Sequence, residues 1–179
     1  MSRIGKMPIA LPAGVEVKFE NGIVTVKGPK GTLTREVVGN IGIEVEGANL
    51  VVKALDDARD TNAKHGLYRA LLNGMVTGVT AGFVKSLEVK GVGWKVSTDG
   101  SKLTMNVGFS HQVIMTAREG IKFECPTATD INVIGISKEL VGQTAAEIRA
   151  VRVPEPYHGY GIRYKGENVE HKESDKGKK

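Results

Sequence analysis

Hydrophobic and polar residues alternate in short runs along most of the chain, as expected for strands that bury one face. The first two runs lie at 15–19 and 23–27, and the Asn21-Gly22 pair between them is a strong signal for a hairpin turn. Further strands of this half are expected at 32–38, 43–46 and 50–55. A second series of runs predicts strands at 86–90, 94–98, 102–107, 112–116, 121–124 and 131–136. The short connections favour mainly antiparallel pairing.

A helical pattern follows each series of strands. The first runs from about 60 to 79, and its apolar residues predict a stripe that covers the sheet: Leu67, Leu71, Met75 and Val79. The second begins near Ser137, a suitable N-cap residue, and ends before Pro154. Its buried side is expected to hold Leu140 or Val141, Ala145, Ile148 and Val151. Each half therefore supplies one helix that packs on its strands.

The two halves are copies of one supersecondary unit. Tyr68-Arg69-Ala70-Leu71 aligns with Ile148-Arg149-Ala150-Val151 at an offset of 80 residues. Two copies are too few for a solenoid, which needs more repeats for stability. We therefore predict an α+β protein of two similar tandem domains, 1–82 and 83–179, in which a mainly antiparallel β-sheet packs on one α-helix.

Composition excludes several classes of protein. No run approaches the roughly 20 apolar residues that cross a bilayer, and the start of the chain lacks the apolar region of a secretory signal. A cytoplasmic location without membrane contact is therefore expected. Cys125 is the only cysteine, which excludes an internal disulfide and favours a small core residue.

Charge and the distribution of histidines narrow the choice of partner. The net charge of +5 and the pI near 9.3 suit a polyanion. The four histidines are scattered, and none forms the spaced pair that places two metal ligands on one helical face. We therefore expect no catalytic site, metal, cofactor or small-molecule substrate.

The segment 154–164 is the most informative part of the chain, because it combines helix-stopping prolines with two alternate glycines and three tyrosines. Gly159 and Gly161 allow tight turns and a close approach of the main chain to a surface. Tyrosine rings offer flat faces, and only Glu155 opposes the neighbouring cations, which are Arg152, Arg163 and Lys165. These residue types indicate RNA contact. On the residues alone, a surface loop whose tyrosines pack on their own domain is an equal alternative.

Two glycine-rich motifs have simpler interpretations than nucleotide binding. The run 27–31 lacks the helix and the Lys-Ser/Thr pair of a phosphate loop, so we expect a hairpin tip with Lys30 as a minor candidate for RNA contact. The run 91–94 lacks the third glycine of a dinucleotide site. A kinked strand with Trp94 in a packing role is expected there.

Five islands occur in a characteristic order along the chain. They are Met1-Ser2-Arg3-Ile4 with Pro12-Ala13-Gly14-Val15; Val92-Gly93-Trp94 with Val107-Gly108-Phe109-Ser110-His111; Glu124-Cys125-Pro126-Thr127; Gly142-Gln143-Thr144-Ala145-Ala146 running into Arg149; and 154–164. On these islands the chain resembles the bacterial large-subunit ribosomal proteins of the L-six family over essentially its whole length. The resemblance implies two similar α/β domains. It also implies binding to large-subunit rRNA, mainly through the C-terminal domain, near the stalk base and the factor-binding region.

The chain departs from the family within the last island. The family usually has Lys-Gly-Lys-Gly where this chain has His158-Gly159-Tyr160-Gly161, so two cations are replaced. Stacking by Tyr160 on a base or ribose is expected to compensate, at roughly 1 to 3 kcal/mol per base. The residues that we expect to contact RNA are Arg152, Pro154, Tyr157, His158, Gly159, Tyr160, Gly161, Arg163, Tyr164 and Lys165.

These patterns predict a non-catalytic structural protein of the large ribosomal subunit, located on cytoplasmic ribosomes, that supports translation. Its expected partners are large-subunit rRNA and neighbouring ribosomal proteins near the stalk base. A protein-interaction module is the main alternative, and it predicts binding with little salt dependence. A hydrolase or transferase would need convergent titratable groups, which the sequence does not offer. The charged tail, 166–179, is expected to be mobile when the protein is free.

Overall fold

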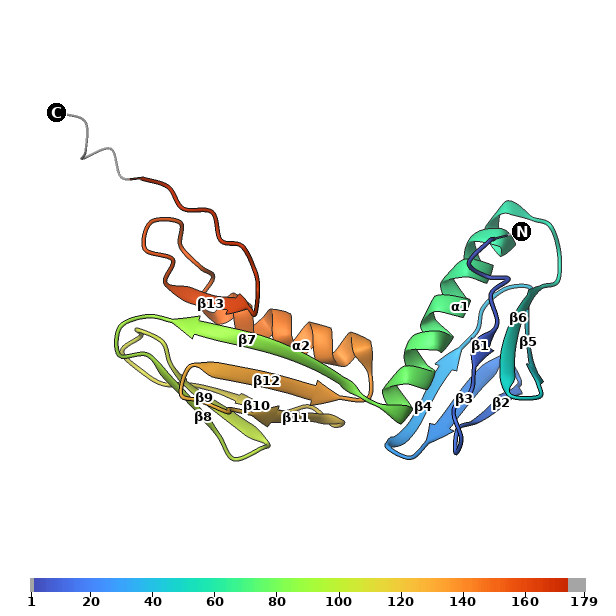
Figure 1. Cartoon of the computed structure of the whole chain (residues 1–179), viewed down its shortest axis with the longest axis horizontal. Coiled ribbons are helices and arrows are strands. Elements are labelled where there is room, and N and C mark those ends of the chain that lie inside the picture. Colours follow the sequence, from blue (N-terminus) through green and yellow to red (C-terminus); the bar gives the residue numbers. More distant parts are fainter. Residues whose placement is uncertain (1, 174–179) are drawn as a thin grey trace. The chain divides into compact units, whose positions relative to one another are not determined.

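The chain forms two compact units (Figure 1), which a computed structural model describes for residues 2–173. The first unit contains the residues up to Phe83 together with Ile136–Lys138. The second contains Val84–Gly135 and the residues from Glu139 on. The end of the predicted mobile tail, 174–179, lies outside the described residues.

The first unit consists of six strands and one helix, which are β1 (Ile9–Ala10), β2 (Glu16–Glu20), β3 (Ile23–Gly28), β4 (Gly31–Glu36), β5 (Ile41–Glu46), β6 (Asn49–Ala54) and α1 (Arg59–Thr80). The strands pair antiparallel in two sheets, with the orders β2-β3-β4 and β1-β6-β5. Helix α1 contacts strands of both sheets. The apolar alternation identified β2 to β6, but it missed the two-residue strand β1 and did not show that the strands divide between two sheets.

Turn chemistry explains the hairpins of this unit. Asn21 and Gly22 have φ values of 52° and 73°, and the flanking residues Glu20 and Ile23 pair across the turn. This is the left-handed backbone that a two-residue hairpin requires, and the predicted turn is confirmed. The run 27–31 is also a hairpin tip rather than a phosphate loop, since Gly28 pairs with Gly31.

Lys30, at this second hairpin tip, is used inside its own domain. Its ammonium group donates to the carbonyl of Ala81 at 2.7 Å, and its amide donates to the carbonyl of Val79 at 3.0 Å. Both acceptors lie at the C-terminal end of α1, where carbonyls have no partner within the helix. Lys30 therefore caps a helix end within its own domain, and its contact with RNA stays a prediction.

The buried side of α1 differs from the predicted stripe. Leu67 is 53% exposed and Leu71 is only partly buried. Met75 and Val79 are buried as predicted, and the other buried apolar residues are Tyr68, Leu72 and Val76. A residue every fourth position advances by about 40° around a helix of 3.6 residues per turn, so a long four-residue series leaves the buried side. The true stripe alternates steps of three and four.

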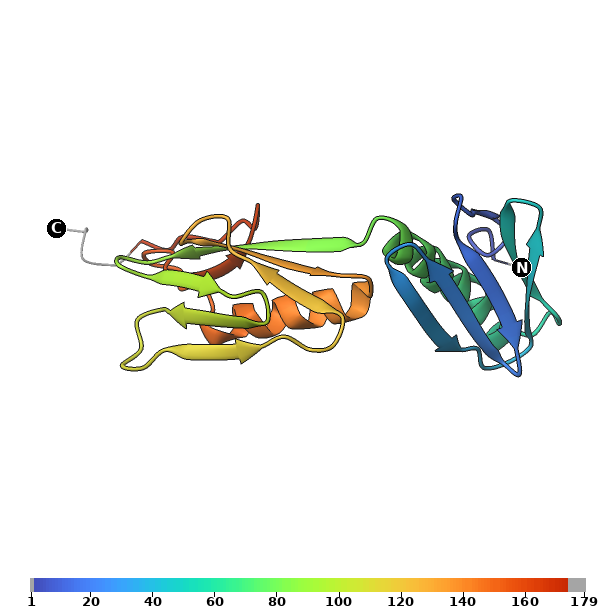
Figure 2. The same cartoon turned by 90° about the horizontal axis from the view of Figure 1, so that it is seen from below.

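The second unit contains seven strands and one helix, which are β7 (Phe83–Lys90), β8 (Lys95–Thr98), β9 (Lys102–Asn106), β10 (Val113–Thr116), β11 (Ile121–Glu124), β12 (Asp130–Gly135), α2 (Lys138–Val151) and β13 (Gly161–Tyr164). Its two sheets have the orders β11-β12-β7-β13 and β10-β9-β8. Figure 2 shows the two sheets from a second direction. Helix α2 buries Val141, Ala145 and Ile148 as predicted. An α+β fold of two similar tandem domains is confirmed.

Strand β13 is the main element that the sequence pattern did not reveal. Gly161 pairs with Lys90 and Tyr164 pairs with Leu87, so the end of the glycine-rich segment forms the edge of a four-stranded sheet. Ile162, between them, is completely buried. The last four residues of the segment are therefore a strand rather than a loop.

Among residues 2–173, no helix combines the length and the apolar character needed to span a bilayer.

We propose that 1–82 and 83–179 fold independently. Each part retains its own set of completely buried apolar side chains, such as Leu72 in the first and Phe123 in the second. Both fragments are therefore expected to unfold cooperatively on heating, as followed by circular dichroism. A fragment that lacks a cooperative transition under conditions where the intact chain shows one would contradict this boundary.

Candidate nucleic-acid interface

The segment 152–165 leaves helix α2, forms a loop and returns to the sheet as β13. The amide of Ile162 donates to the carbonyl of Arg152 at 2.7 Å, which closes the loop at its base. The amide of Lys165 donates to the carbonyl of Ser86 at 3.0 Å, beyond the end of β13. The loop between these anchors is therefore held by its own domain.

Glu155 organises the loop from within. Its carboxylate accepts backbone N–H groups of Tyr157 at 2.9 Å, His158 at 2.6 Å and Tyr160 at 3.3 Å. Partial removal from water raises the pKa of Glu155, but the three N–H donors and the neighbouring His158 outweigh this and hold the pKa below its ordinary value of 4.5. Glu155, which in the sequence only opposed the cations, is thus a support of the loop.

Gly161 permits a close approach of the chain to itself. Its φ is 152°, and a Cβ atom there would clash with the Cα and N atoms of Pro154 and lie 2.9 Å from the carbonyl carbon of Val153. These are backbone atoms that cannot move aside. The sequence predicted a close approach of the main chain to a surface, and here the surface that Gly161 meets is the protein's own loop.

Arg163 lies inside the domain. The residue is only 8% exposed, and its Nη2 atom donates to the carbonyl of Gly159 at 2.7 Å. Its Nε atom has no hydrogen-bond partner among the described residues. Gly159 itself is buried with a φ of 73°, a backbone conformation that favours glycine. Arg163 therefore supports the loop from behind.

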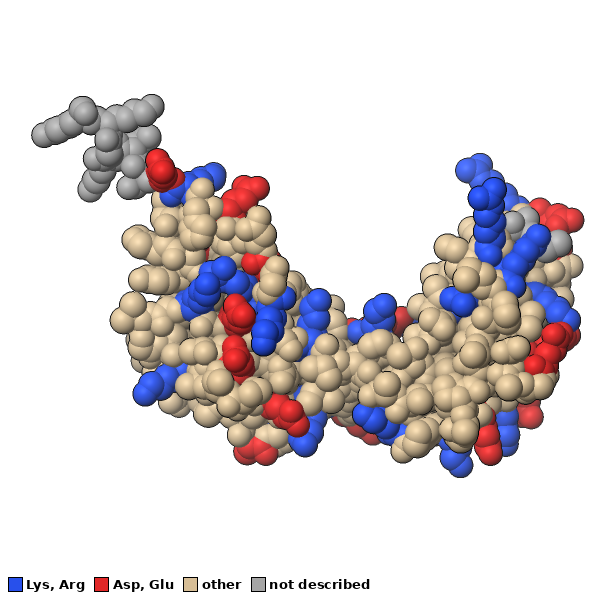
Figure 3. Space-filling model, in the orientation of Figure 1, with Lys and Arg blue, Asp and Glu red and all other residues tan. Residues whose placement is uncertain are grey.

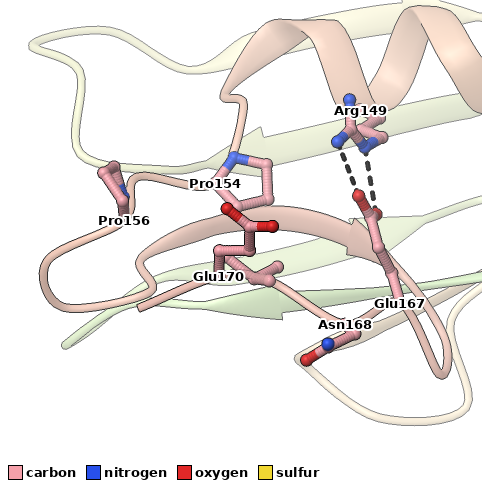
Figure 4. A pocket seen from close by; sticks show the side chains of 7 residues that line it. Arg149, Pro154, Pro156, Glu167, Asn168 and Glu170 are labelled. Carbon is pink, nitrogen blue, oxygen red and sulfur yellow. Dashed lines mark hydrogen bonds and ion pairs between the residues drawn. The ribbon is translucent and has the colours of Figure 1, made fainter. Parts of the chain in front are cut away.

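A second internal ion pair fixes the chain after β13. Arg149 donates from Nε and Nη2 to the two carboxylate oxygens of Glu167, at 3.0 and 2.6 Å (Figure 4). Glu167 also accepts the amide of Tyr164 at 2.9 Å. The side-chain hydrogen bond with Arg149 is the main reason why the pKa of Glu167 lies below its ordinary value of 4.5. The charge of Arg149 is therefore already neutralised.

The same pair borders an open pocket of about 250 Å³. Its other lining residues come from the loop and from the chain after β13, namely Pro154, Pro156, Asn168, Val169 and Glu170 (Figure 4). The pocket is lined by two carboxylates and by one arginine that is already paired, so its lining carries no net positive charge. The pocket is thus an unsuitable place for a phosphate.

Arg152 and Lys165 are the cations of this segment that remain available, and Arg152 rests on two aromatic rings. Its guanidinium carbon lies 5.6 Å from the ring centroid of Trp94 and 4.9 Å from that of Phe109. Between residues 2 and 173, no carboxylate forms an ion pair with it. Trp94 and Phe109 were not predicted as site residues, although both belong to the islands on which the family resemblance rests.

The remaining predicted contact residues divide into exposed and supporting groups. Tyr157 and Tyr160 are 56% and 40% exposed, and His158 and Lys165 are exposed as well. Tyr164 is half-buried beneath cations, with the ammonium of Lys85 at 4.8 Å from its ring centroid. The structure therefore brings Arg152, Tyr157, His158, Tyr160 and Lys165 to the surface and assigns Gly159, Gly161 and Arg163 to the interior.

Charges on the visible face of the second unit are mixed. Figure 3 shows Lys and Arg side chains alternating with Asp and Glu, rather than a field of one sign. Across residues 2–173, no group of three or more His, Cys, Asp or Glu residues is arranged to hold a metal ion. Cys125 is half-buried rather than in the core, and burial raises the pKa of its thiol, which disfavours the nucleophilic thiolate.

Comparison with known proteins identifies the family. The profile of the family described as Ribosomal protein L6 matches residues 11–82 and 90–165. The chain is 56% identical to the large ribosomal subunit protein uL6 of Streptococcus agalactiae serotype Ia over 178 residues, covering 99% of this chain and 100% of the relative. It is 57% identical to uL6 of Streptococcus uberis and 54% identical to uL6 of Streptococcus thermophilus, with the same coverage.

The chain therefore belongs to the ribosomal protein L6 family. It is a structural, non-enzymatic protein of the large ribosomal subunit, and RNA binding is typical of this family. The predicted cytoplasmic, ribosomal location follows from that membership.

Replacement of Gly161 by alanine is expected to destabilise the C-terminal domain. Gly166→Ala is the matched control, because Gly166 also has a positive φ, of 83°, but open space around a Cβ atom. The control is expected to cost about 1 to 2 kcal/mol from backbone strain, and Gly161→Ala about 1 to 3 kcal/mol more from the clash with Pro154. Urea unfolding measures both, and equal losses would contradict the close approach.

The Arg149–Glu167 pair is expected to stabilise the protein in a pH-dependent way. Because the pKa of Glu167 is lower in the folded state, its contribution is complete above 4.5 and is lost as the pH falls through the folded-state pKa. Glu167→Gln is therefore expected to cost about 1 to 3 kcal/mol at pH 7, and progressively less in acid.

Urea unfolding of the parent and variant at several pH values measures this difference. Glu170→Gln is the control, since Glu170 lines the same pocket and forms no ion pair with another described residue. A difference that stays constant from neutral to acidic pH would show that the charge of Glu167 is not involved.

Proposed function

We propose that the C-terminal domain binds large-subunit rRNA through the exposed part of the segment 152–165. The observation that carries this proposal is Arg152, a half-buried guanidinium that rests on two aromatic rings and has no carboxylate partner among the described residues. A guanidinium held on rings without an acid partner keeps N–H donors free for an anion. A phosphate group fits, because arginine presents planar N–H donors to its oxygens.

Most other charged groups in or beside the segment support the loop rather than the contact. Glu155 and Arg163 are used within the loop, and Arg149 is paired with Glu167. The exposed ammonium of Lys165 adds a second phosphate contact, and the exposed tyrosines add flat faces for riboses or bases. Contact through a few cations and several rings suits recognition of folded RNA by its shape.

The family resemblance supports a finer assignment. We propose that the bound rRNA lies near the stalk base and the translation-factor-binding region, with neighbouring ribosomal proteins as further partners. There the protein braces one conformation of the RNA and so supports translation. Its contribution is positional, since phosphate neutralisation and loop packing involve no chemical step.

The salt dependence of binding to purified large-subunit rRNA tests the interface. Arg152→Gln with Lys165→Gln removes two cations while keeping polar side chains. Lys102→Gln with Lys122→Gln is the matched control, because both lysines are exposed on strands of the same unit. The site variant is expected to flatten the slope of log affinity against log salt by about two contacts, and the control to leave it unchanged.

Two outcomes would contradict the proposal. Tight binding by the parent with an unchanged slope in the site variant would place the RNA contact elsewhere on the chain. Absence of salt-dependent binding by the parent would favour the protein-interaction module instead.

A further inference from the structure

Planar side chains from separate loops of the second unit form one continuous row. In the loop between β9 and β10, His111 stacks on Phe109, with ring centroids 5.9 Å apart and planes inclined by 19°. The guanidinium of Arg152 follows at 4.9 Å from the Phe109 centroid and lies 5.6 Å from the centroid of Trp94. Trp94 comes from the loop between β7 and β8.

The row continues into the C-terminal segment. Trp94 and Tyr160 have centroids 6.3 Å apart, with planes inclined by 57°. Tyr160 stacks on His158 at 5.5 Å and 23°. In order, the ring row is His111, Phe109, Arg152, Trp94, Tyr160 and His158.

The ring row lies at the surface, although rings usually pack inside. His111, His158 and Tyr160 are exposed, and Phe109 is 37% exposed. Glycines leave room for this arrangement. Gly108 has a φ of 81°, and a Cβ atom there would lie 3.0 Å from the Trp94 ring; a Cβ atom on Gly91 would clash with the same ring. The loops thus hold Trp94 in place while leaving the ends of the row uncovered.

The charge around the ring row favours an anionic occupant. Arg152 provides a cation inside the row and has no carboxylate partner in the described part of the chain. Lys95, next to Trp94, is exposed. Glu155, the acid nearest in sequence to Arg152, directs its carboxylate to backbone N–H groups of the loop and lies 3.5 Å from Nδ1 of His158. Arg152 is therefore not engaged by a carboxylate of the described residues and remains available to an anion.

We infer that the ring row is a stacking surface for unpaired RNA bases, an inference that rests on the proposed rRNA binding. It extends the interface from the C-terminal segment to 91–94 and 107–112. Bases within a duplex are already stacked on one another, so the fitting partner is a loop, a bulge or an end. Every base has a flat face, and stacking on aromatic side chains tolerates any sequence. Arg152 then meets the phosphates beside the stacked bases.

Binding of purified large-subunit rRNA by Phe109→Leu and His111→Ala variants tests the ring row. Phe109→Leu keeps apolar bulk but removes the ring, and Phe109→Tyr restores a ring in the same place. Phe109→Leu with His111→Ala is expected to weaken binding between about fivefold and about 100-fold, while the salt slope stays as in the parent. Phe109→Tyr is expected to bind like the parent. Thermal unfolding verifies that each variant is folded.

The outcomes separate this inference from the proposed function. If the parent binds rRNA and the ring-removing variant binds equally well, the stacking surface is wrong while rRNA binding stands, and a protein becomes the occupant to test. Loss of affinity with a flattened salt slope would also overturn it, because phosphate contacts would then have been lost. Failure of the parent to bind rRNA would refute both.

A second probe asks directly whether bases are needed. Trp94 is the only tryptophan of the chain and lies inside the ring row, so its fluorescence reports stacking there. A short oligoadenylate is expected to quench this emission, and the abasic ribose-phosphate chain of equal length and charge is not. Equal responses to the two probes would overturn the inference.

Discussion

The contact between the backbones of Gly161 and Pro154 is the constraint on which the candidate interface depends. It lets the chain that leaves α2 return beside itself and enter the sheet as β13. The loop that this return creates is short enough for one carboxylate, that of Glu155, to gather three of its N–H groups. Without the close approach, neither the buried strand residue Ile162 nor the exposed tyrosines would keep their places.

The interface separates charges that hold the protein together from charges that remain for a partner. Arg149 and Arg163 satisfy acceptors within the C-terminal domain, whereas Arg152 rests on aromatic rings. The net charge of the segment therefore says little about its affinity for RNA. What matters is which cations lack an internal partner, and that is decided by folding.

Part of this arrangement was predictable from local patterns. Asn21-Gly22 requires a left-handed backbone and sets its hairpin by local chemistry, and the apolar alternation located the strands other than β1 and β13. The buried side of α1 was predicted wrongly at Leu67, because a four-residue series drifts around a helix. Strand β13 was missed because its pairing partner, β7, lies far away in the sequence.

The same limit applies to the candidate site. Residue types indicated RNA contact by 154–164. Of the ten predicted residues, Tyr157, His158, Tyr160 and Lys165 are exposed, and Arg152 is half-buried. The interior position of Arg163 and the ring contacts of Arg152 depend on tertiary packing that no local pattern encodes. Trp94 and Phe109 could be found from sequence only as aromatic residues beside glycines.

The pairing of β13 with β7 also determines when the loop can form. Ribosomes synthesise a chain from its N-terminus, and β13 (Gly161–Tyr164) follows the other strands and the helix of the second unit along the chain. Until that strand has emerged, Ile162 cannot be buried and the base of the loop cannot close. The surface proposed to meet RNA can thus be completed only after every other strand and helix of the second unit has emerged from the ribosome.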